Sequence, residues 1–219
     1  MTVGVFGKLP ARRDFVQHMV EPRLMELFDP WLQGAVAQSR EQLGESWLQV
    51  YLQAPIWRFW LGPKITGKPV LGALMPSVDG VGRYFPLCII GTFDTMIGPP
   101  EIDEQEEWFA TVEALMLAAL ADDGTYEAVQ AGITTLPQPN DAISVPVDGG
   151  GVKGMFTTLR HAQMRDFYGN LSYWWVPSPD GGATPPRAFV RRGLPSPVEY
   201  AMMIGMEHGQ TAISDPGGV

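Results

Sequence analysis

Two apolar runs, Val70–Met75 and Phe85–Phe93, flank a loop that contains the dipeptide Asp79-Gly80. The first run, VLGALM, is apolar on both faces, which is typical of a central strand covered on both sides. An Asp-Gly pair between two apolar runs is a strong signal for a hairpin turn. The two runs therefore predict antiparallel strands in the middle of a sheet that carries helices on both faces.

Strands and helices are also expected in the rest of the chain. Further strands are expected at Thr2–Phe6, Ile56–Leu61, Leu171–Val176 and Arg187–Arg192. The spacing of apolar residues predicts helices at Pro22–Val36 with a kink or break at Pro30, at Ser46–Gln53, at Glu101–Asp122, at Tyr126–Ala131 and from Pro197 to about Met206. The predicted fold class is α/β: a three-layer sandwich in which a mixed, largely antiparallel sheet of five or six strands has helices on both faces.

The chain length of 219 residues suits one domain, and the sequence shows neither an internal repeat nor an interdomain linker. We expect a single domain over residues 1–206. Residues 207–219 lack periodicity and are expected to form a flexible tail. Trp174 and Trp175 are adjacent in an expected strand, so their side chains must face opposite sides of the sheet.

The charge balance argues against several classes of partner. The chain holds 15 Lys and Arg against 24 Asp and Glu, a formal net charge of −9. Nucleic-acid binding and a polybasic membrane anchor both require a local basic surplus, so neither is expected. No long apolar stretch precedes Lys8, and the apolar segment Trp108–Ala121 is too short to span a bilayer and carries Glu113. We expect a cytoplasmic protein that does not insert into membranes.

Searches for catalytic and metal-binding motifs find little. The three histidines, His18, His161 and His208, do not lie at metal-ligand spacing. Cys88 is the single cysteine, which excludes zinc sites built on cysteine pairs, and its apolar surroundings predict a buried, inert thiol. No G-x-S-x-G nucleophile motif is present. We therefore expect no catalytic residue, no metal and no cofactor, and a protein that is not an enzyme.

Charged residues gather in the loop after the first strand and in the hairpin connection. They are Lys8, Arg12, Arg13 and Asp14 in the first loop, and Asp79 and Arg83 in the second. One interpretation is a shared polar surface used for binding. The other is that Asp14 or Asp79 pairs with an arginine, or caps backbone N–H groups, and so holds the loops in place. We expect in particular a partly buried ion pair between Asp14 and Arg83.

Four segments of the chain resemble one known family. They read GVFGKLPARRDF at residues 4–15, WLQVYLQAPIWRF at 47–59, GALMPSVDGVGRYFP at 72–86, and SYWW at 172–175 with RGLP at 192–195. In this order they resemble the TagF family, also called ImpM, whose members are accessory proteins of bacterial type VI secretion systems. Arg13 stands where the family pattern has an expected glycine.

The resemblance implies a three-layer α/β fold and a cytoplasmic protein without established catalytic activity. It also implies a post-translational repressor of type VI secretion that acts beside the threonine-phosphorylation pathway and contacts its forkhead-associated scaffold protein. Lys8, Arg12 and Arg13 place three cations within six residues of an otherwise acidic chain. We expect these cations to bind an acidic or phosphorylated segment of that partner.

Two other functions remain open. A small hydrolase or nucleotide-binding enzyme would use Lys8, Asp14, Asp79 and Arg83 in one pocket, and turnover assays with nucleotides would reveal it. A purely structural component of the apparatus would co-purify with sheath or baseplate proteins. A regulator would instead co-purify with scaffold or kinase-pathway proteins.

Overall fold

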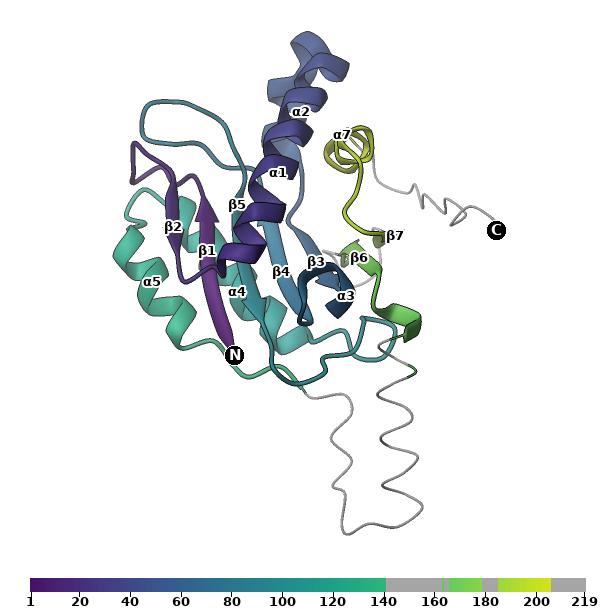
Figure 1. The fold of residues 1–219 in the computed structure, drawn as a ribbon. Helices are drawn as coiled ribbons and strands as arrows, with labels where there is room; N and C mark the ends of the chain where they lie inside the picture. Colours follow the sequence, from purple (N-terminus) through teal and green to yellow (C-terminus); the bar gives the residue numbers. More distant parts are fainter. Residues whose placement is uncertain (141–162, 164–165, 179–184, 206–219) are drawn as a thin grey trace, which may run out of the picture.

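A computed structural model describes residues 1–140, 163, 166–178 and 185–205 of the chain. Within them, one seven-stranded antiparallel sheet runs through the molecule in the order β2-β1-β5-β4-β3-β6-β7 (Figure 1). The strands are β1 (Thr2–Gly7), β2 (Val16–His18), β3 (Trp57–Leu61), β4 (Val70–Met75), β5 (Leu87–Thr92), β6 (Leu171–Val176) and β7 (Arg187–Arg192). Every pair of neighbouring strands is antiparallel, so the sheet is not mixed.

Helices cover both faces of the sheet and complete three layers, which confirms the predicted α/β sandwich (Figure 1). One face carries α1 (Pro22–Leu43), α2 (Trp47–Gln53) and α7 (Pro197–Gly205). The other face carries α4 (Glu106–Leu120) and α5 (Tyr126–Thr134). The short helices η1 (Gly44–Ser46) and α3 (Pro63–Thr66) lie in connections.

The sheet separates two hydrophobic cores. Phe59 and Trp174 belong to the core shared with α1 and α7. Their chain neighbours Trp60 and Trp175 pack in the core shared with α4. The predicted opposite orientation of Trp174 and Trp175 is therefore confirmed, as the two-residue period of a strand requires.

The predicted hairpin of two central strands is present as β4 and β5. The two strands pair from Val70 opposite Thr92 to Met75 opposite Leu87, and every residue in both strands is buried. Gly72 lies under the ring of Phe59, where a Cβ atom would come within 2.2 Å of the ring. The lack of a side chain at residue 72 therefore lets an aromatic ring lie directly on the central strand.

Three expectations from the sequence differ from the structure. α1 continues through Pro30 without a break, because Pro30 is exposed and the carbonyl group that it leaves without a donor can face water. α4 begins at Glu106 rather than at Glu101, because Gln105 adopts a left-handed backbone conformation (φ 55°) just before it. The three-residue strand β2 was not expected, so the sheet has seven strands rather than five or six.

The sheet does not divide into separate domains within the described residues. β6 pairs with β3, and α7 packs against α1 and α2, so the last described elements complete the layers built by the first. The expected flexible tail, residues 207–219, lies outside the described residues. None of the described helices is both long and apolar enough to cross a membrane.

Candidate functional site

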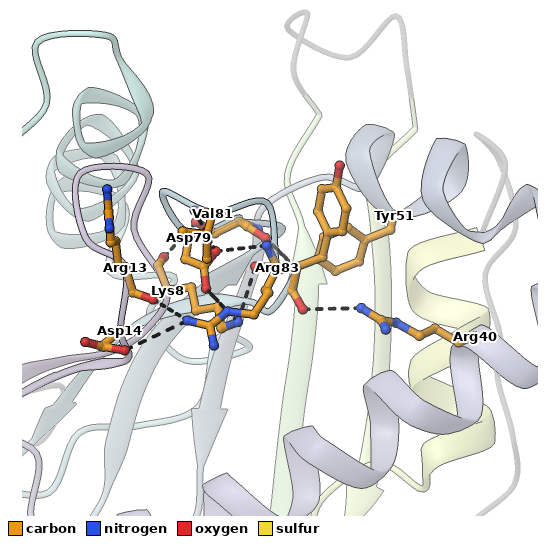
Figure 2. Close-up of polar contacts among 10 residues, drawn as sticks. Lys8, Arg13, Asp14, Arg40, Tyr51, Asp79, Val81 and Arg83 are labelled. Atoms are coloured by element: carbon orange, nitrogen blue, oxygen red, sulfur yellow. Dashed lines mark hydrogen bonds and ion pairs between the residues drawn. The ribbon is translucent and has the colours of Figure 1, made fainter.

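The charged loops after β1 and between β4 and β5 meet at one end of the sheet (Figure 2). Lys8 and Asp79 form a buried ion pair there, with 3.0 Å between Lys8 Nζ and Asp79 Oδ2. The side chain of Lys8 is only 8% exposed and that of Asp79 is fully buried. We call the contacts among Lys8, Ser77, Asp79 and Arg83 the loop junction.

Asp79 is the centre of the loop junction. Its Oδ1 accepts hydrogen bonds from the backbone N–H groups of Val81 and Arg83, and its Oδ2 accepts one from Arg83 Nε at 2.6 Å. Burial disfavours the carboxylate, but the hydrogen bonds from the Arg83 backbone, Lys8 and the Arg83 side chain outweigh it and hold the pKa of Asp79 well below its usual range. Asp79 is therefore a charged group with hydrogen-bond partners on both oxygens, and it fixes the backbone of the connection between β4 and β5.

Buried hydrogen bonds tie the loop junction to the rest of the fold. Ser77 Oγ donates to the backbone carbonyl of Lys8 at 2.7 Å. The hydroxyl group of Tyr51 on α2 donates to the Ser77 carbonyl and accepts from the Ser77 N–H group. Burial raises the pKa of Tyr51, so this hydroxyl keeps its proton and can serve as both donor and acceptor. The loop junction therefore connects the loop after β1, through Ser77, to α2.

The structure confirms one of the two interpretations of these charges and corrects two details. Asp79 both pairs with an arginine and caps backbone N–H groups, as the loop-holding interpretation predicts. Asp14 and Arg83 do form the expected ion pair, with 3.9 Å between Asp14 Oδ1 and Arg83 Nη2, but its expected partial burial is wrong, because the two side chains are 97% and 58% exposed. Lys8 was expected to bind a partner, but its ammonium group is buried, where it contacts the Asp79 carboxylate and the Arg83 carbonyl.

Arg83 fixes the loop after β1 from its exposed side. Its Nη2 donates to the backbone carbonyl of Arg13, and the Gly80 N–H group donates to the backbone carbonyl of Arg12 at 2.8 Å. The side chain of Arg13 points away from the junction (Figure 2). The backbone at residues 12 and 13 is thus held while both arginine side chains remain exposed.

An open hollow of about 320 Å³ lies beside this loop, lined by residues 12–17 and Tyr126. Arg12 and Arg13 supply its cations, and Phe15 and Tyr126 supply aromatic surface. Phe15 is 48% exposed although it packs on Phe6 and Phe85. Asp14 adds one carboxylate to the lining, but the two exposed arginines outnumber it and, with the aromatic rings, are suited to binding an anionic side chain.

Sequence reasoning missed a second buried charge cluster. Arg58 is the second residue of β3 and is 2% exposed. Its guanidinium group donates two hydrogen bonds each to Glu106 and Glu113 of α4, at 2.5–3.1 Å. Burial opposes the charge, but the hydrogen bonds to Glu113 and Glu106 outweigh it and raise the pKa of Arg58.

The cluster could have been found from two signals in the sequence. Arg58 is a lone charge in the apolar run IWRFWL, and a buried arginine requires acidic partners. Glu106 and Glu113 are seven residues apart, about two helical turns, which places them on the same face of a helix. Because both glutamates of α4 pair with the one arginine of β3, we assign the cluster to holding α4 on the sheet.

Comparison with known families assigns the protein to a class. The model of a family described as the TagF N-terminal domain, type VI secretion system-associated, matches residues 4–136. This range runs from within β1 to just beyond α5 and contains the whole loop junction. The chain is therefore a type VI secretion system-associated protein, and it belongs to the TagF family.

A solved structure extends the likeness to the whole fold. PA0076 from Pseudomonas aeruginosa PAO1 is similar over 100% of both chains, with 27% sequence identity and a TM-score of 0.76. β6, β7 and α7, which lie beyond the family match, are thus included in the similarity. A search of curated proteins found no match.

Proposed function

We propose that this protein acts in the cytoplasm as a post-translational repressor of type VI secretion, by binding an acidic or phosphorylated segment of the forkhead-associated scaffold protein. The observation that carries the proposal is the open hollow with Arg12 and Arg13 on a loop that the buried junction holds in place. The chain as a whole is acidic, with a formal net charge of −9. An anionic segment would therefore be steered toward this loop.

Protein binding is favoured over the alternative of a small hydrolase or nucleotide-binding enzyme. That alternative uses Lys8, Asp14, Asp79 and Arg83 in one pocket. Lys8 and Asp79 are instead buried against each other, whereas Asp14 and Arg83 are exposed at the surface. The buried pair is enclosed by its own hydrogen bonds, which leaves the exposed arginines as the groups that a ligand meets first.

The test in cells replaces the gene by variants of itself. We expect deletion to raise effector export without raising transcript levels of the secretion cluster, and the wild-type gene to restore repression. Arg12→Glu combined with Arg13→Glu should fail to restore it. Unchanged export in the deletion strain, under conditions where the system is poised to fire, would refute the proposal.

The test with purified proteins measures scaffold binding by calorimetry at two salt concentrations. The Arg12→Glu, Arg13→Glu variant should bind more weakly, and wild-type binding should weaken as salt rises. The matched control is Lys64→Glu with Lys68→Glu, which reverses two cations of similar exposure (40% and 43%). Circular dichroism should show that both variants fold, because changes of exposed charges alter stability by no more than about 0.5 kcal/mol.

A further inference from the structure

Arg12 already holds a carboxylate in the free protein. Its Nη2 lies 2.5 Å from Glu127 Oε1, and its guanidinium carbon lies 4.8 Å from the centre of the Tyr126 ring. Glu127 is 115 residues away in sequence, at the start of α5. The contact therefore joins two separate parts of the fold across the rim of the hollow.

The Arg12–Glu127 ion pair is exposed and can therefore dissociate. The side chain of Arg12 is 45% exposed and that of Glu127 is 70% exposed. An ion pair this exposed is weak, because water competes for both charges. Tyr126 is half-buried, and its ring contacts the guanidinium group independently of the carboxylate of Glu127. A stronger oxyanion could thus replace Glu127 without disturbing the ring or the loop.

The outer side of the hollow suits an extended chain. Val16 and Gln17 of β2 line it, and β2 is an edge strand with no neighbour on its outer side within the described residues. An unpaired strand edge can accept backbone hydrogen bonds from an added segment. The basic rim and this edge lie beside the same hollow.

We infer that the Glu127 carboxylate takes the place of the ligand at the Arg12 guanidinium group in the free protein. An extended peptide with one phosphorylated or acidic side chain binds by displacing this carboxylate from Arg12. This inference rests on the proposed function and names the chemistry of the segment that the protein recognises. The incoming oxyanion binds Arg12 over Tyr126, with Arg13 on the same loop. A phosphate group can make two parallel hydrogen bonds to a guanidinium group, which favours the exchange.

The direct test measures calorimetric affinity for a nine-residue peptide of alternating valine and threonine whose central threonine is phosphorylated. Glu127→Gln removes the competitor and should tighten binding about two- to fivefold, the range expected for loss of an exposed ion pair. Arg12→Gln should weaken binding at least about tenfold, since it removes a charge-assisted contact. Inorganic phosphate and the unphosphorylated peptide should each bind more weakly than the phosphopeptide.

The matched control is Asp166→Asn. Asp166 pairs with Lys64 at 3.1 Å, and the two side chains are 78% and 40% exposed, so this change also removes one acidic charge and frees one exposed cation. It should leave the affinity for the phosphopeptide unchanged. Equal tightening by Asp166→Asn and Glu127→Gln would show a general charge effect and overturn the inference. So would failure of the phosphopeptide to bind, or a Glu127→Gln affinity equal to wild type.

The results also separate this inference from the proposed function. If Glu127→Gln tightens phosphopeptide binding but deletion leaves effector export unchanged, the inference stands and the repressor function fails. If deletion raises export but the phosphopeptide does not depend on Arg12 or Glu127, the function stands and this binding mode fails. Replacing the phosphothreonine by glutamate shows which source of the oxyanion the site prefers.

Discussion

At the scale of single residues, charged groups that are close together in the sequence near the loop junction differ in burial and in role. Lys8 and Asp79 are buried and serve the fold, whereas Arg12 and Arg13 are exposed. The difference arises from the groups that lie opposite each charge. Asp79 offers the lysine a carboxylate that is itself held by backbone N–H groups, so the pair replaces the water that both groups lose.

Asp79→Asn should destabilise the protein without changing its surface charge pattern near Arg12. The neutral amide leaves Lys8 buried beside no anion, and removing one partner of a buried pair is strongly destabilising. We expect the midpoint of thermal unfolding to fall by roughly 5–15 °C. Asp14→Asn is the control, since Asp14 is 97% exposed, and it should shift the midpoint by little.

The same pair predicts a dependence on pH. The pKa of Asp79 is lower in the folded protein than the value of about 3.9 in an unfolded chain. Its contribution to stability is therefore complete above about pH 5 and is lost as the pH falls below 4 toward the folded pKa. The stability difference between wild type and Asp79→Asn, measured by urea unfolding, should be constant from pH 5 to 8 and shrink below pH 4. A difference that persists undiminished at pH 3 would contradict this assignment.

Residue-level prediction succeeded where local chemistry decides and failed where distant partners decide. The capping role of Asp79 was among the interpretations because aspartate side chains commonly accept hydrogen bonds from backbone N–H groups nearby in the sequence. The burial of Lys8 depends on a partner 71 residues away, and local sequence carries no sign of it. The pairing of Arg12 with Glu127 was missed for the same reason.

At the scale of elements, Arg58 explains how α4 is oriented on the sheet. β3 projects this arginine toward α4, where Glu106 and Glu113 bind it with four hydrogen bonds. The ring of Phe109, on the same helix, lies 5.2 Å from the guanidinium carbon. A helix that slid or turned on the sheet would lose these bonds, so the cluster fixes its position as well as its attachment.

Substitutions in this cluster should destabilise the protein more when the charge left unpaired or removed is more deeply buried. Arg58→Met should cost roughly 3–5 kcal/mol, because Glu113, only 22% exposed, would lose its counter-charge. Glu106→Gln should cost at most about 1 kcal/mol, because Glu106 is 63% exposed. Denaturant unfolding measures both. Arg58→Met with Glu113→Leu should be more stable than Arg58→Met alone, and a double variant less stable than the single one would argue against a charge left unpaired.

Strands were predictable from the sequence where both of their faces are buried over five or more residues. β4 and β5 are buried along their whole length, so their apolar runs identify them. β2 has three residues and one buried side chain, too little for a pattern. The start of α4 depends on Gln105, whose left-handed backbone is accompanied by a hydrogen bond from its N–H group to Asp103. Acidic residues before a helix indicate that a helix is near, but not at which residue it begins.

At the scale of the whole molecule, the sheet makes the matched family region dependent on the strands and helix C-terminal to it. Residues 4–136 span five strands and end before β6 and β7. Without β6, the fully buried strand β3 would become an edge. Trp31 of α1 would also lose its ring contacts with Trp174 and Tyr200.

A fragment of residues 1–136 should therefore not fold into a rigid monomer. We expect weak near-ultraviolet circular dichroism, no cooperative thermal transition and a tendency to aggregate through the uncovered edge of β3. The full chain, measured in parallel, should melt cooperatively. A sharp transition and dispersed amide spectra for the fragment would instead show that β6, β7 and α7 are an addition to an independent domain.

The strand order also determines how long each strand remains without its pairing partner while the chain is synthesised. Gly7 pairs with Leu87 and Thr2 with Thr92, so β1 emerges from the ribosome 80 to 90 residues before its partner β5. At about 5–20 residues per second, β1 waits roughly 4–18 s with its apolar side chains uncovered. β3 waits longer for β6, because Leu61 pairs with Ser172. The nascent chain thus passes through a period in which unfinished sheet edges are open to chaperones or to other chains, and only the last third of the protein closes it.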